Sequence, residues 1–248
     1  MTHDKPTLSK LFDLGMDIRS EPQSDLENLL KPHSEIFKDK MVLDLACYTG
    51  VSSNYVQQCG AKFVIGVDYD AHALGIAKKK FLNNRLEFLC QDIENSQLLA
   101  PLVGLSQVII TFGALYHLTD CYRFCGTVAQ PHVEYLLFDT LYGPETLEPD
   151  AYCRFEKQIK STGKMEQIIP KYVHNLSWFM QQLDSSGFGV DRIEKYYTTT
   201  DFTKVKDVNA NMRMSMRFFN RKKFPDKKSF TINEVWEWSD SNLIQEQT

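Results

Sequence analysis

The feature that most constrains this chain is a regular alternation of short apolar runs and helical segments between residues 41 and 139. Apolar runs indicate strands at 41–46, 62–68, 85–90, 106–112 and 132–139. Helical patterns separate these runs at 52–60, 71–84, 96–103 and 119–129. Strands that alternate with helices form βαβ crossovers, and uniformly apolar strands are buried on both faces. The sequence therefore predicts an α/β, Rossmann-like fold, with a mostly parallel sheet and helices on both of its faces.

On either side of this alternation the pattern changes, which predicts three parts of the chain. Residues 1–40 are predicted to form an N-terminal arm and helical lid, with Pro32 interrupting the helical spacing of 25–37. Residues 41–223 form the main domain and carry an insert at 141–174, after the fifth strand. The remaining residues, 224–248, are predicted to be a partly ordered tail.

Regular patterns return after the insert. A helical pattern at 175–188 closes on Gly187, and the segments 190–202 and 211–223 then alternate with period two. This alternation predicts an antiparallel pair of strands at the edge of the sheet.

Composition limits the possible classes of function. The chain has 248 residues, of which 43% are hydrophobic and 24% charged, so it can bury a core, and its net charge of -4 gives no global attraction for a polyanion. No apolar run approaches the roughly 20 residues that span a bilayer, and the N-terminal MTHDKPTLSK lacks the apolar core of a secretory signal. We therefore expect a cytoplasmic protein without a membrane partner, and nothing in the sequence indicates its oligomeric state.

The six cysteines are scattered, without the spacing of a disulfide framework. The closest pair, Cys121 and Cys125, lacks a second pair that would complete a zinc site. This usage predicts buried free thiols in a reducing compartment and no metal site.

Acidic residues stand at the ends of three successive predicted strands. Asp44, Asp68 and Asp92 each follow an apolar run, and the carboxyl ends of parallel strands meet at one edge of a sheet, where ligands bind. One such acid alone is explained equally well as a cap of the next helix. Three together indicate a ligand site, and Asp68, 18 residues after Gly50, is placed to accept both hydroxyls of a ribose. This position suits NAD and S-adenosylmethionine equally.

The loop after the first strand separates these two ligands. A pyrophosphate needs glycines in a G-x-G-x-x-G frame, whereas VLDLACYTG places Asp44, Ala46, Tyr48 and Gly50 at alternate positions. An edge rich in acids suits a ligand with a cationic end, such as the ammonium and sulfonium of S-adenosylmethionine. Asp92 is placed to accept a hydrogen bond from an exocyclic amine such as that of adenine. NAD is therefore the second choice.

Taken together, these motifs resemble the class I S-adenosylmethionine-dependent methyltransferases over roughly residues 40–223. VLDLACYTG resembles the first loop of that family, IGVDYD its ribose-binding strand end, LCQDIEN its adenine-contacting strand end and FGALYHLTD its fourth-strand segment. The resemblance implies a seven-stranded, mostly parallel sheet with an antiparallel strand, and S-adenosylmethionine as the cofactor, with S-adenosylhomocysteine as the product. It also implies a role for each matching residue: the methionine part of the cofactor for Asp44, Ala46, Tyr48 and Gly50, the ribose for Asp68, the adenine for Asp92 and Ile93, and the methionine end for Phe112 and Gly113.

The first loop departs from the family pattern because Ala46 and Tyr48 replace two of its three usual glycines. Alanine tolerates most backbone geometries, but tyrosine adopts a positive φ poorly. We therefore expect either that the loop is reshaped at Tyr48 or that this side chain forms a wall of the site.

Candidates for the chemistry follow the fourth and fifth strands. Methyl transfer to a hydroxyl needs alignment and a base. His117 is the first candidate for the base, with Tyr116 beside it, and the alternative is that both residues only cap the helix that begins near Thr119. Asp139 is a second candidate base or orienting residue, and the alternative for it is a carboxylate that caps a loop.

Two further groups of residues have open interpretations. The aromatic residues after the fifth strand are either an acceptor lid or part of the core: Tyr142, Tyr152, Phe155, Tyr172, Trp178 and Phe179. The basic residues Arg213, Arg217, Arg221, Lys222 and Lys223 either bind RNA or phosphorylated sugars, or protect a solvated edge strand, which is the simpler explanation.

The sequence thus predicts an S-adenosylmethionine-dependent methyltransferase that acts on oxygen or nitrogen of a small-molecule acceptor. One alternative is a transferase that modifies tRNA, because the segment around Tyr116 and His117 also resembles wobble-uridine carboxymethyltransferases. The chain shows no obvious appended RNA-binding domain, which makes RNA the less favoured partner. The other alternative is a non-catalytic S-adenosylmethionine-binding protein, suggested by the altered loop.

Overall fold

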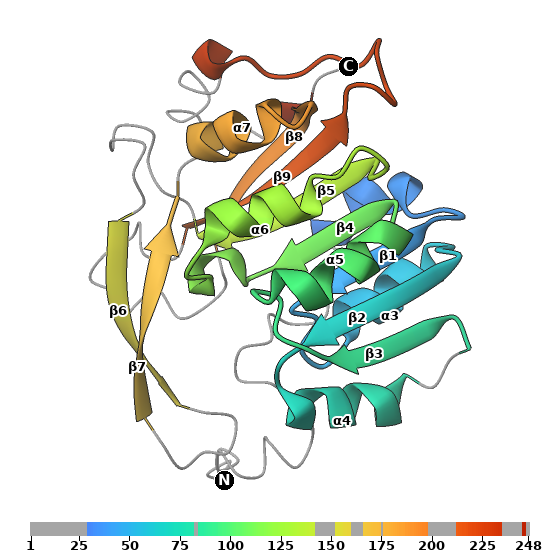
Figure 1. Ribbon diagram of the computed structural model, residues 1–248, viewed down its shortest axis with the longest axis vertical. Coiled ribbons are helices and arrows are strands. Elements are labelled where there is room, and N and C mark those ends of the chain that lie inside the picture. Colours follow the sequence, from blue (N-terminus) through green and yellow to red (C-terminus); the bar gives the residue numbers. More distant parts are fainter. Residues whose placement is uncertain are drawn as a thin grey trace, which may run out of the picture.

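The computed structural model describes residues 29–81, 84–141, 152–159, 166–174, 176–197, 212–234 and 245–246. Its main sheet has the seven predicted strands and a two-residue eighth strand, β10, in the order β10-β8-β9-β5-β4-β1-β2-β3 (Figure 1). Five of them are parallel: β1 (Met41–Leu45), β2 (Phe63–Asp68), β3 (Leu86–Cys90), β4 (Val108–Phe112) and β5 (Tyr135–Leu141). All five predicted strands are therefore confirmed, and the strand order reverses between β1 and β4, which places a ligand site at their carboxyl ends.

Helices join the parallel strands, as the sequence predicts. They are α3 (Val51–Gln58), α4 (Ala71–Lys80), α5 (Ser96–Leu105) and α6 (Cys121–Val128). Each of the last three begins at an N-cap side chain that accepts from backbone N–H groups, namely Asp70, Asn95 and Asp120. Ahead of β1, the helical pattern broken by Pro32 becomes the 3-10 helix η1 (Lys31–Ile36).

The antiparallel pair predicted at the sheet edge exists, but its inner strand is not an edge strand. β9 (Met212–Asn220) pairs with β5 on one side and with β8 (Phe188–Tyr197) on the other. A two-residue strand, β10 (Gln245–Glu246), pairs with the outer side of β8. Every residue from Arg213 to Asn220 is buried, so the interpretation of this run as a solvated, charge-protected edge is wrong.

The insert contains a hairpin that the sequence analysis did not predict. Its strands, β6 (Tyr152–Ile159) and β7 (Glu166–Val173), form a separate antiparallel sheet (Figure 1). Most of the aromatics proposed as a lid, namely Tyr142, Tyr152, Phe155 and Tyr172, lie outside the described side chains. The other two lie on α7 (Leu176–Asp184), where Phe179 is fully buried and Trp178 packs against the same core.

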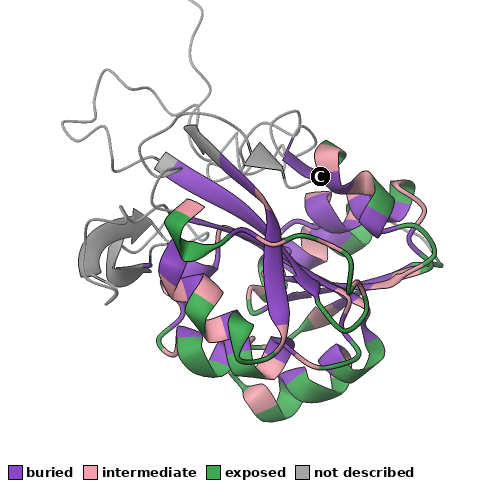
Figure 2. Cartoon of the chain, turned by 90° about the horizontal axis from the view of Figure 1, so that it is seen from above, coloured by how far each residue is buried: buried purple, intermediate pink, exposed green. Residues whose placement is uncertain are grey.

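Two apolar layers cover the two faces of the main sheet. One layer contains residues of α5, α6 and α7, and the other contains residues of η1, α3 and α4. Figure 2 shows the strands as buried bands, with exposed residues on the outer sides of the helices. Helices on both faces leave the carboxyl ends of the parallel strands as the natural place for a ligand.

Candidate functional site

The first loop begins at a buried carboxylate. Asp44 is 1% exposed, and its Oδ2 accepts hydrogen bonds from the hydroxyls of Ser52 at 2.6 Å and Ser53 at 2.5 Å, both in the first turn of α3. Burial raises the pKa of Asp44 to about 7; the two serine hydroxyls oppose this shift, and the negative charge of Asp68 adds to it. The loop therefore holds a carboxyl group that titrates near neutral pH.

The backbone of this loop keeps a left-handed conformation at alternate residues. The φ angles are 58° at Ala46, 48° at Tyr48 and 75° at Gly50, the three positions where the family pattern carries glycines. The left-handed region costs a non-glycine residue about 1–2 kcal/mol. The expectation that Tyr48 would reshape the loop is therefore wrong for the backbone, because the turn is kept despite the side chain.

Asp68, at the end of β2, is joined directly to the first loop. Its Oδ2 accepts the N–H of Tyr48 at 2.9 Å, and its Oδ1 accepts the N–H of Asp70 at 2.8 Å. The backbone also links the two segments, since the N–H of Cys47 donates to the carbonyl of Val67 at 3.0 Å. The structure thus brings together the residues predicted to hold the methionine part and the ribose.

Close packing requires glycine at two positions, Gly50 in the loop and Gly66 in β2. The sequence gives no signal for the second of them. A Cβ at Gly50 would lie 2.5 Å from the Phe88 ring, and a Cβ at Gly66 would lie 2.7 Å from the same ring and 2.8 Å from Ser53 Oγ. Gly66 lies inside β2, and only the packed structure shows that Phe88 and Ser53 converge on it.

Asp92 and Ile93 lie in the loop after β3, at the same edge of the sheet. The Oδ1 of Asp92 accepts the N–H of Glu94 at 2.9 Å, and Ile93 packs partly against the core. The N–H of Gln91 donates to the carbonyl of Asp68 at 2.9 Å, which fixes this loop to the end of β2. The ends of β1, β2 and β3 therefore form one acidic edge.

Beyond β4 the chain presents a glycine and an aromatic pair. Gly113 follows Phe112 with φ 71°, and the short 3-10 helix η2 (Leu115–His117) comes next. Tyr116 is buried and His117 half-buried, and their ring centroids are 4.4 Å apart. Both candidate catalytic side chains therefore lie at the end of β4, next to the predicted methionine end of the cofactor.

Arg213 also belongs to this part of the site, and the sequence analysis did not place it there. Its guanidinium forms an ion pair with Asp139 of β5 and lies 5.6 Å from the ring centroid of Tyr116. A Cβ at Gly113 would lie 3.2 Å from Arg213 Nη2 and 3.5 Å from the Tyr116 hydroxyl, so both groups approach this glycine. No local signal revealed this, because the pairing of β9 with β5 joins residues more than 70 positions apart.

The second buried arginine of β9 serves another ion-pair network. Arg217 donates to both oxygens of Asp191, at 3.0 and 3.1 Å, and to Glu35 at 2.8 Å. Lys227 contacts Asp191 as well, at 2.6 Å. Neither Arg213 nor Arg217 offers the exposed basic face that RNA binding by this strand would need.

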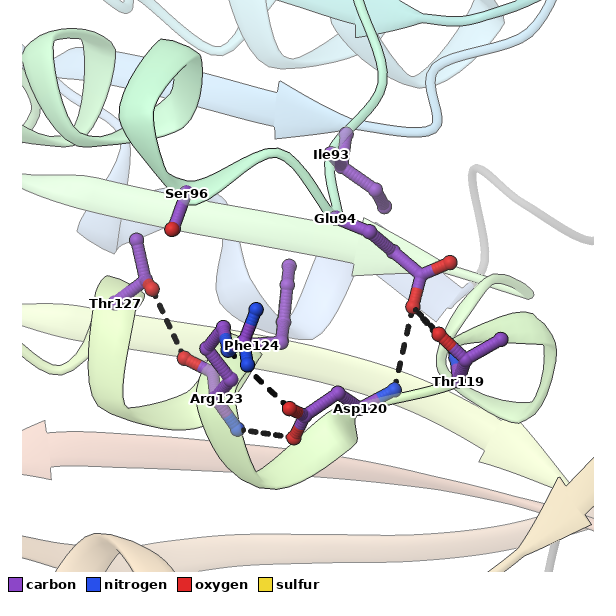
Figure 3. Close-up of a pocket in the computed structure, with 8 residues that line it drawn as sticks. All are labelled: Ile93, Glu94, Ser96, Thr119, Asp120, Arg123, Phe124 and Thr127. Carbon is purple, nitrogen blue, oxygen red and sulfur yellow. Dashed lines mark hydrogen bonds and ion pairs between the residues drawn. The ribbon is translucent and has the colours of Figure 1, made fainter.

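Beside the acidic edge, a small pocket lies between the loop after β3 and the start of α6 (Figure 3). Its lining includes Ile93, Glu94, Thr119 and Asp120, and in Figure 3 the Glu94 carboxylate points at Thr119.

Cys121 and Cys125 are free thiols buried on α6. Among the described residues, no group of three or more His, Cys, Asp or Glu side chains could hold a metal ion. Within the same residues, no helix is long and apolar enough to cross a membrane.

Comparison with known sequences gives a family match and a distant relative. Residues 42–130 match the model of a methyltransferase domain. The chain is also 26% identical over 218 residues to protein arginine N-methyltransferase 1 of Saccharomyces cerevisiae, which covers 86% of this chain and 61% of that protein. The chain thus spans about three fifths of the length of this relative.

Solved structures give the same fold at low identity. A putative S-adenosylmethionine-dependent methyltransferase from Listeria monocytogenes superposes with a TM-score of 0.60 at 18% identity, covering 79% of this chain and 99% of that one. The magnesium protoporphyrin IX methyltransferase of Synechocystis PCC 6803 with bound S-adenosylmethionine gives 0.52 at 16%, covering 88% and 86%. A putative RNA methyltransferase from Pyrococcus horikoshii also gives 0.52 at 16%, covering 80% and 82%. These likenesses confirm the predicted fold class.

Proposed function

We propose that the chain is a class I S-adenosylmethionine-dependent methyltransferase and that it transfers a methyl group from this cofactor to oxygen or nitrogen of a small-molecule acceptor. The observation that carries the proposal is the first loop. Its three left-handed residues lie between Asp44 and Asp68, and Tyr48 bonds directly to Asp68. This arrangement keeps the backbone geometry of a cofactor loop even where the glycines are absent.

The carboxylates of the acidic edge fit the cofactor chemically, because they accept hydrogen bonds. Asp68 would hold the ribose hydroxyls, Asp92 and Ile93 the adenine, and the loop from Asp44 to Gly50 the methionine part. A cation near Asp44 favours its ionised form, so the ammonium of the cofactor would offset the cost of burying this carboxylate. When bound, S-adenosylmethionine supplies a methyl group that its sulfonium activates for in-line displacement.

Residues at the ends of β4 and β5 would prepare the acceptor. We assign His117 as the group that takes the proton of an acceptor hydroxyl, with its ring held against Tyr116. Asp139 is 1% exposed and paired with Arg213, which favours an orienting role over that of a base. Arg213 in turn lies over the ring of Tyr116, so the ion pair would fix the aromatic pair.

A small acceptor is favoured over macromolecular ones by the charges near the site. A guanidinium acceptor, which the yeast relative suggests, needs carboxylates to hold it. The segment 113–120 contains a single acid, Asp120, whose carboxylate accepts the N–H of Arg123 at the start of α6. The neighbouring carboxylates of Glu94 and Asp139 are already engaged, by Thr119 and by Arg213. An RNA acceptor, the second candidate suggested by the Pyrococcus horikoshii structure, needs exposed cations, and Arg213 and Arg217 are buried in ion pairs.

Calorimetry with S-adenosylmethionine and S-adenosylhomocysteine tests the cofactor half of the proposal. We expect both to bind the wild-type chain, and Asp68→Ala to weaken binding about 100-fold, because two hydrogen bonds to a charged group are lost. Asp70→Ala is the matched control, because it removes a carboxylate two residues away that caps α4. If neither ligand binds, or if Asp68→Ala binds them as tightly as the wild type does, the cofactor half of the proposal is overturned.

Transfer of a tritiated methyl group to fractionated cell extract tests the acceptor class. Label in the low-molecular-weight fraction supports the proposal. Label in tRNA, with RNA binding that weakens steeply as salt rises, would support the tRNA alternative instead. Cofactor binding without transfer to any fraction would favour the non-catalytic alternative.

A further inference from the structure

One carboxylate bridges two loops at the ligand edge of the sheet. Glu94 lies two residues after Asp92, and Thr119 lies two residues after His117. The Oε1 of Glu94 accepts hydrogen bonds from the N–H of Thr119 at 2.6 Å, from its hydroxyl at 2.6 Å and from the N–H of Asp120 at 3.2 Å. Figure 3 shows this carboxylate directed across the gap to Thr119 and Asp120.

The position of this carboxylate favours strong hydrogen bonds. Thr119 and Asp120 immediately precede α6, and Asp120 already caps Arg123 with its own side chain. The start of a helix carries unsatisfied N–H groups and a partial positive charge, both of which favour a carboxylate. Charge-assisted hydrogen bonds are shorter and roughly twice as strong as neutral ones. Glu94 therefore acts as a cap that α6 receives from another loop.

The other end of the bridge is fixed as well. The N–H of Glu94 donates to Asp92 Oδ1 at 2.9 Å, and the N–H of Asn95 donates to the carbonyl of Asp92 at 3.2 Å. The N–H of Gln91 holds the same loop to the end of β2. A displacement of Asp92 or of its neighbour Ile93 therefore moves the carboxylate that holds Thr119.

We infer that Glu94 is a positioning residue that couples occupation of the adenine subsite, at Asp92 and Ile93, to the placement of His117. This inference rests on the proposed function, because it takes the cofactor position and the role of His117 from it. Its physical basis is a continuous chain of hydrogen bonds between the two loops, with one residue, Leu118, between His117 and the anchored Thr119.

Adenosine is the probe that separates coupling from direct contact, because it carries the adenine and ribose but lacks the methionine part. The readout is the ring resonance of His117 in the NMR spectrum of the full chain, assigned by its loss in His117→Gln. We expect adenosine to shift this resonance in the wild type and not in Glu94→Ala. Thr119→Val, which keeps the two backbone donors, is expected to retain part of the shift.

Glu87→Gln is the matched control, because it removes a negative charge from an exposed position on β3. It is expected to behave like the wild type. Glu94→Gln keeps the length of the side chain but loses its charge, so a reduced shift is expected; this variant decides the question if Glu94→Ala does not fold.

S-adenosylhomocysteine, titrated into each variant by calorimetry, distinguishes the two possible failures. If the wild type binds neither adenosine nor S-adenosylhomocysteine, the proposed function fails and the inference fails with it. If adenosine binds Glu94→Ala and Glu94→Gln and still shifts His117 as in the wild type, the inference is overturned while the function stands. Retained binding together with loss of the shift in these two variants, but not in Glu87→Gln, supports the inference.

Discussion

The two halves of the main sheet hold buried carboxylates in opposite ways. In the half made by β1, β2 and β3, Asp44 is held by serine hydroxyls and Asp68 by backbone N–H groups. In the half made by β5, β9 and β8, buried carboxylates form ion pairs, Asp139 with Arg213, and Asp191 with Arg217 and Lys227.

This difference separates ligand binding from support. Hydroxyls and N–H groups stabilise a carboxylate without placing an opposite charge beside it, so the first half carries a negative potential when its carboxylates are ionised, and a cationic cofactor can use this potential. Ion pairs neutralise the second half, where the charges fix side chains relative to one another instead. We therefore expect the buried carboxylates of the first half to lower folding stability while they raise the affinity for the cofactor. Those of the second half are expected to stabilise the fold.

The largest expected effect comes from breaking an ion pair in the second half. Asp191→Ala leaves the guanidinium of Arg217 and the ammonium of Lys227 without their shared carboxylate. Removal of one partner of a buried pair costs about 3–5 kcal/mol. Denaturant unfolding should show this loss, and Asp184→Ala, which removes the exposed partner of Arg221, is the control with little change. A loss under about 1 kcal/mol in Asp191→Ala would break the comparison.

The matching change in the first half should have the opposite sign. The pKa of Asp44 is raised from 3.8 to about 7 by burial, so its contribution to stability is present below pH 3.8 and is lost as pH rises through 7. Asp44→Asn should therefore be more stable than the wild type above pH 7, by up to a few kcal/mol, while it binds S-adenosylmethionine more weakly. Unfolding at pH 5 and pH 8, with calorimetry at pH 8, measures both effects. Lower stability of Asp44→Asn at pH 8 would contradict this prediction.

A smaller pH dependence of stability, in the reverse direction, is expected from a histidine near Arg217 of the second half. His33 of η1 is 1% exposed, and burial, with Arg217 and Arg192 nearby, lowers its pKa to about 3. Its contribution to stability is therefore present above pH 6.5 and is lost as pH falls from 6.5 towards 3. His33→Phe should reduce the loss of unfolding free energy between pH 7 and pH 5, which is about 2 kcal/mol at most for one such group. His72→Gln, at an exposed position, serves as the control that leaves this dependence unchanged.

The smallest effect concerns the backbone of the first loop. Tyr48→Gly removes the cost of the left-handed conformation, about 1–2 kcal/mol. Glycine also raises the entropy of the unfolded chain, which lowers the stability of the fold by about 0.5–1 kcal/mol. The net result should be a gain in unfolding free energy of about 1.5 kcal/mol at most. S-adenosylhomocysteine affinity should stay the same if the loop binds through its backbone. A clear drop in affinity would instead make the Tyr48 side chain a wall of the site.

The sequence by itself determined the parallel part of the fold and the acidic edge. Each strand from β1 to β5 is an apolar run bounded by its own local signals, so the five strands and the positions of Asp44, Asp68 and Asp92 followed from the pattern. The ends of parallel strands must meet at one edge, which made these acids neighbours before any contact was known. These features were predictable because they depend on short stretches of chain.

Only the tertiary structure decided where β9 lies and which residues form the ion pairs of the second half. Alternation in residues 211–223 indicates a strand, but the insertion of β9 between β5 and β8 depends on pairing with distant residues. For this reason the sequence favours a solvated edge over RNA binding for Arg213, whereas this side chain lies buried beside Asp139 and Tyr116. The left-handed turn at Tyr48 was likewise decided by its surroundings, since tertiary contacts such as its bond to Asp68 can outweigh a local backbone cost of about 1–2 kcal/mol.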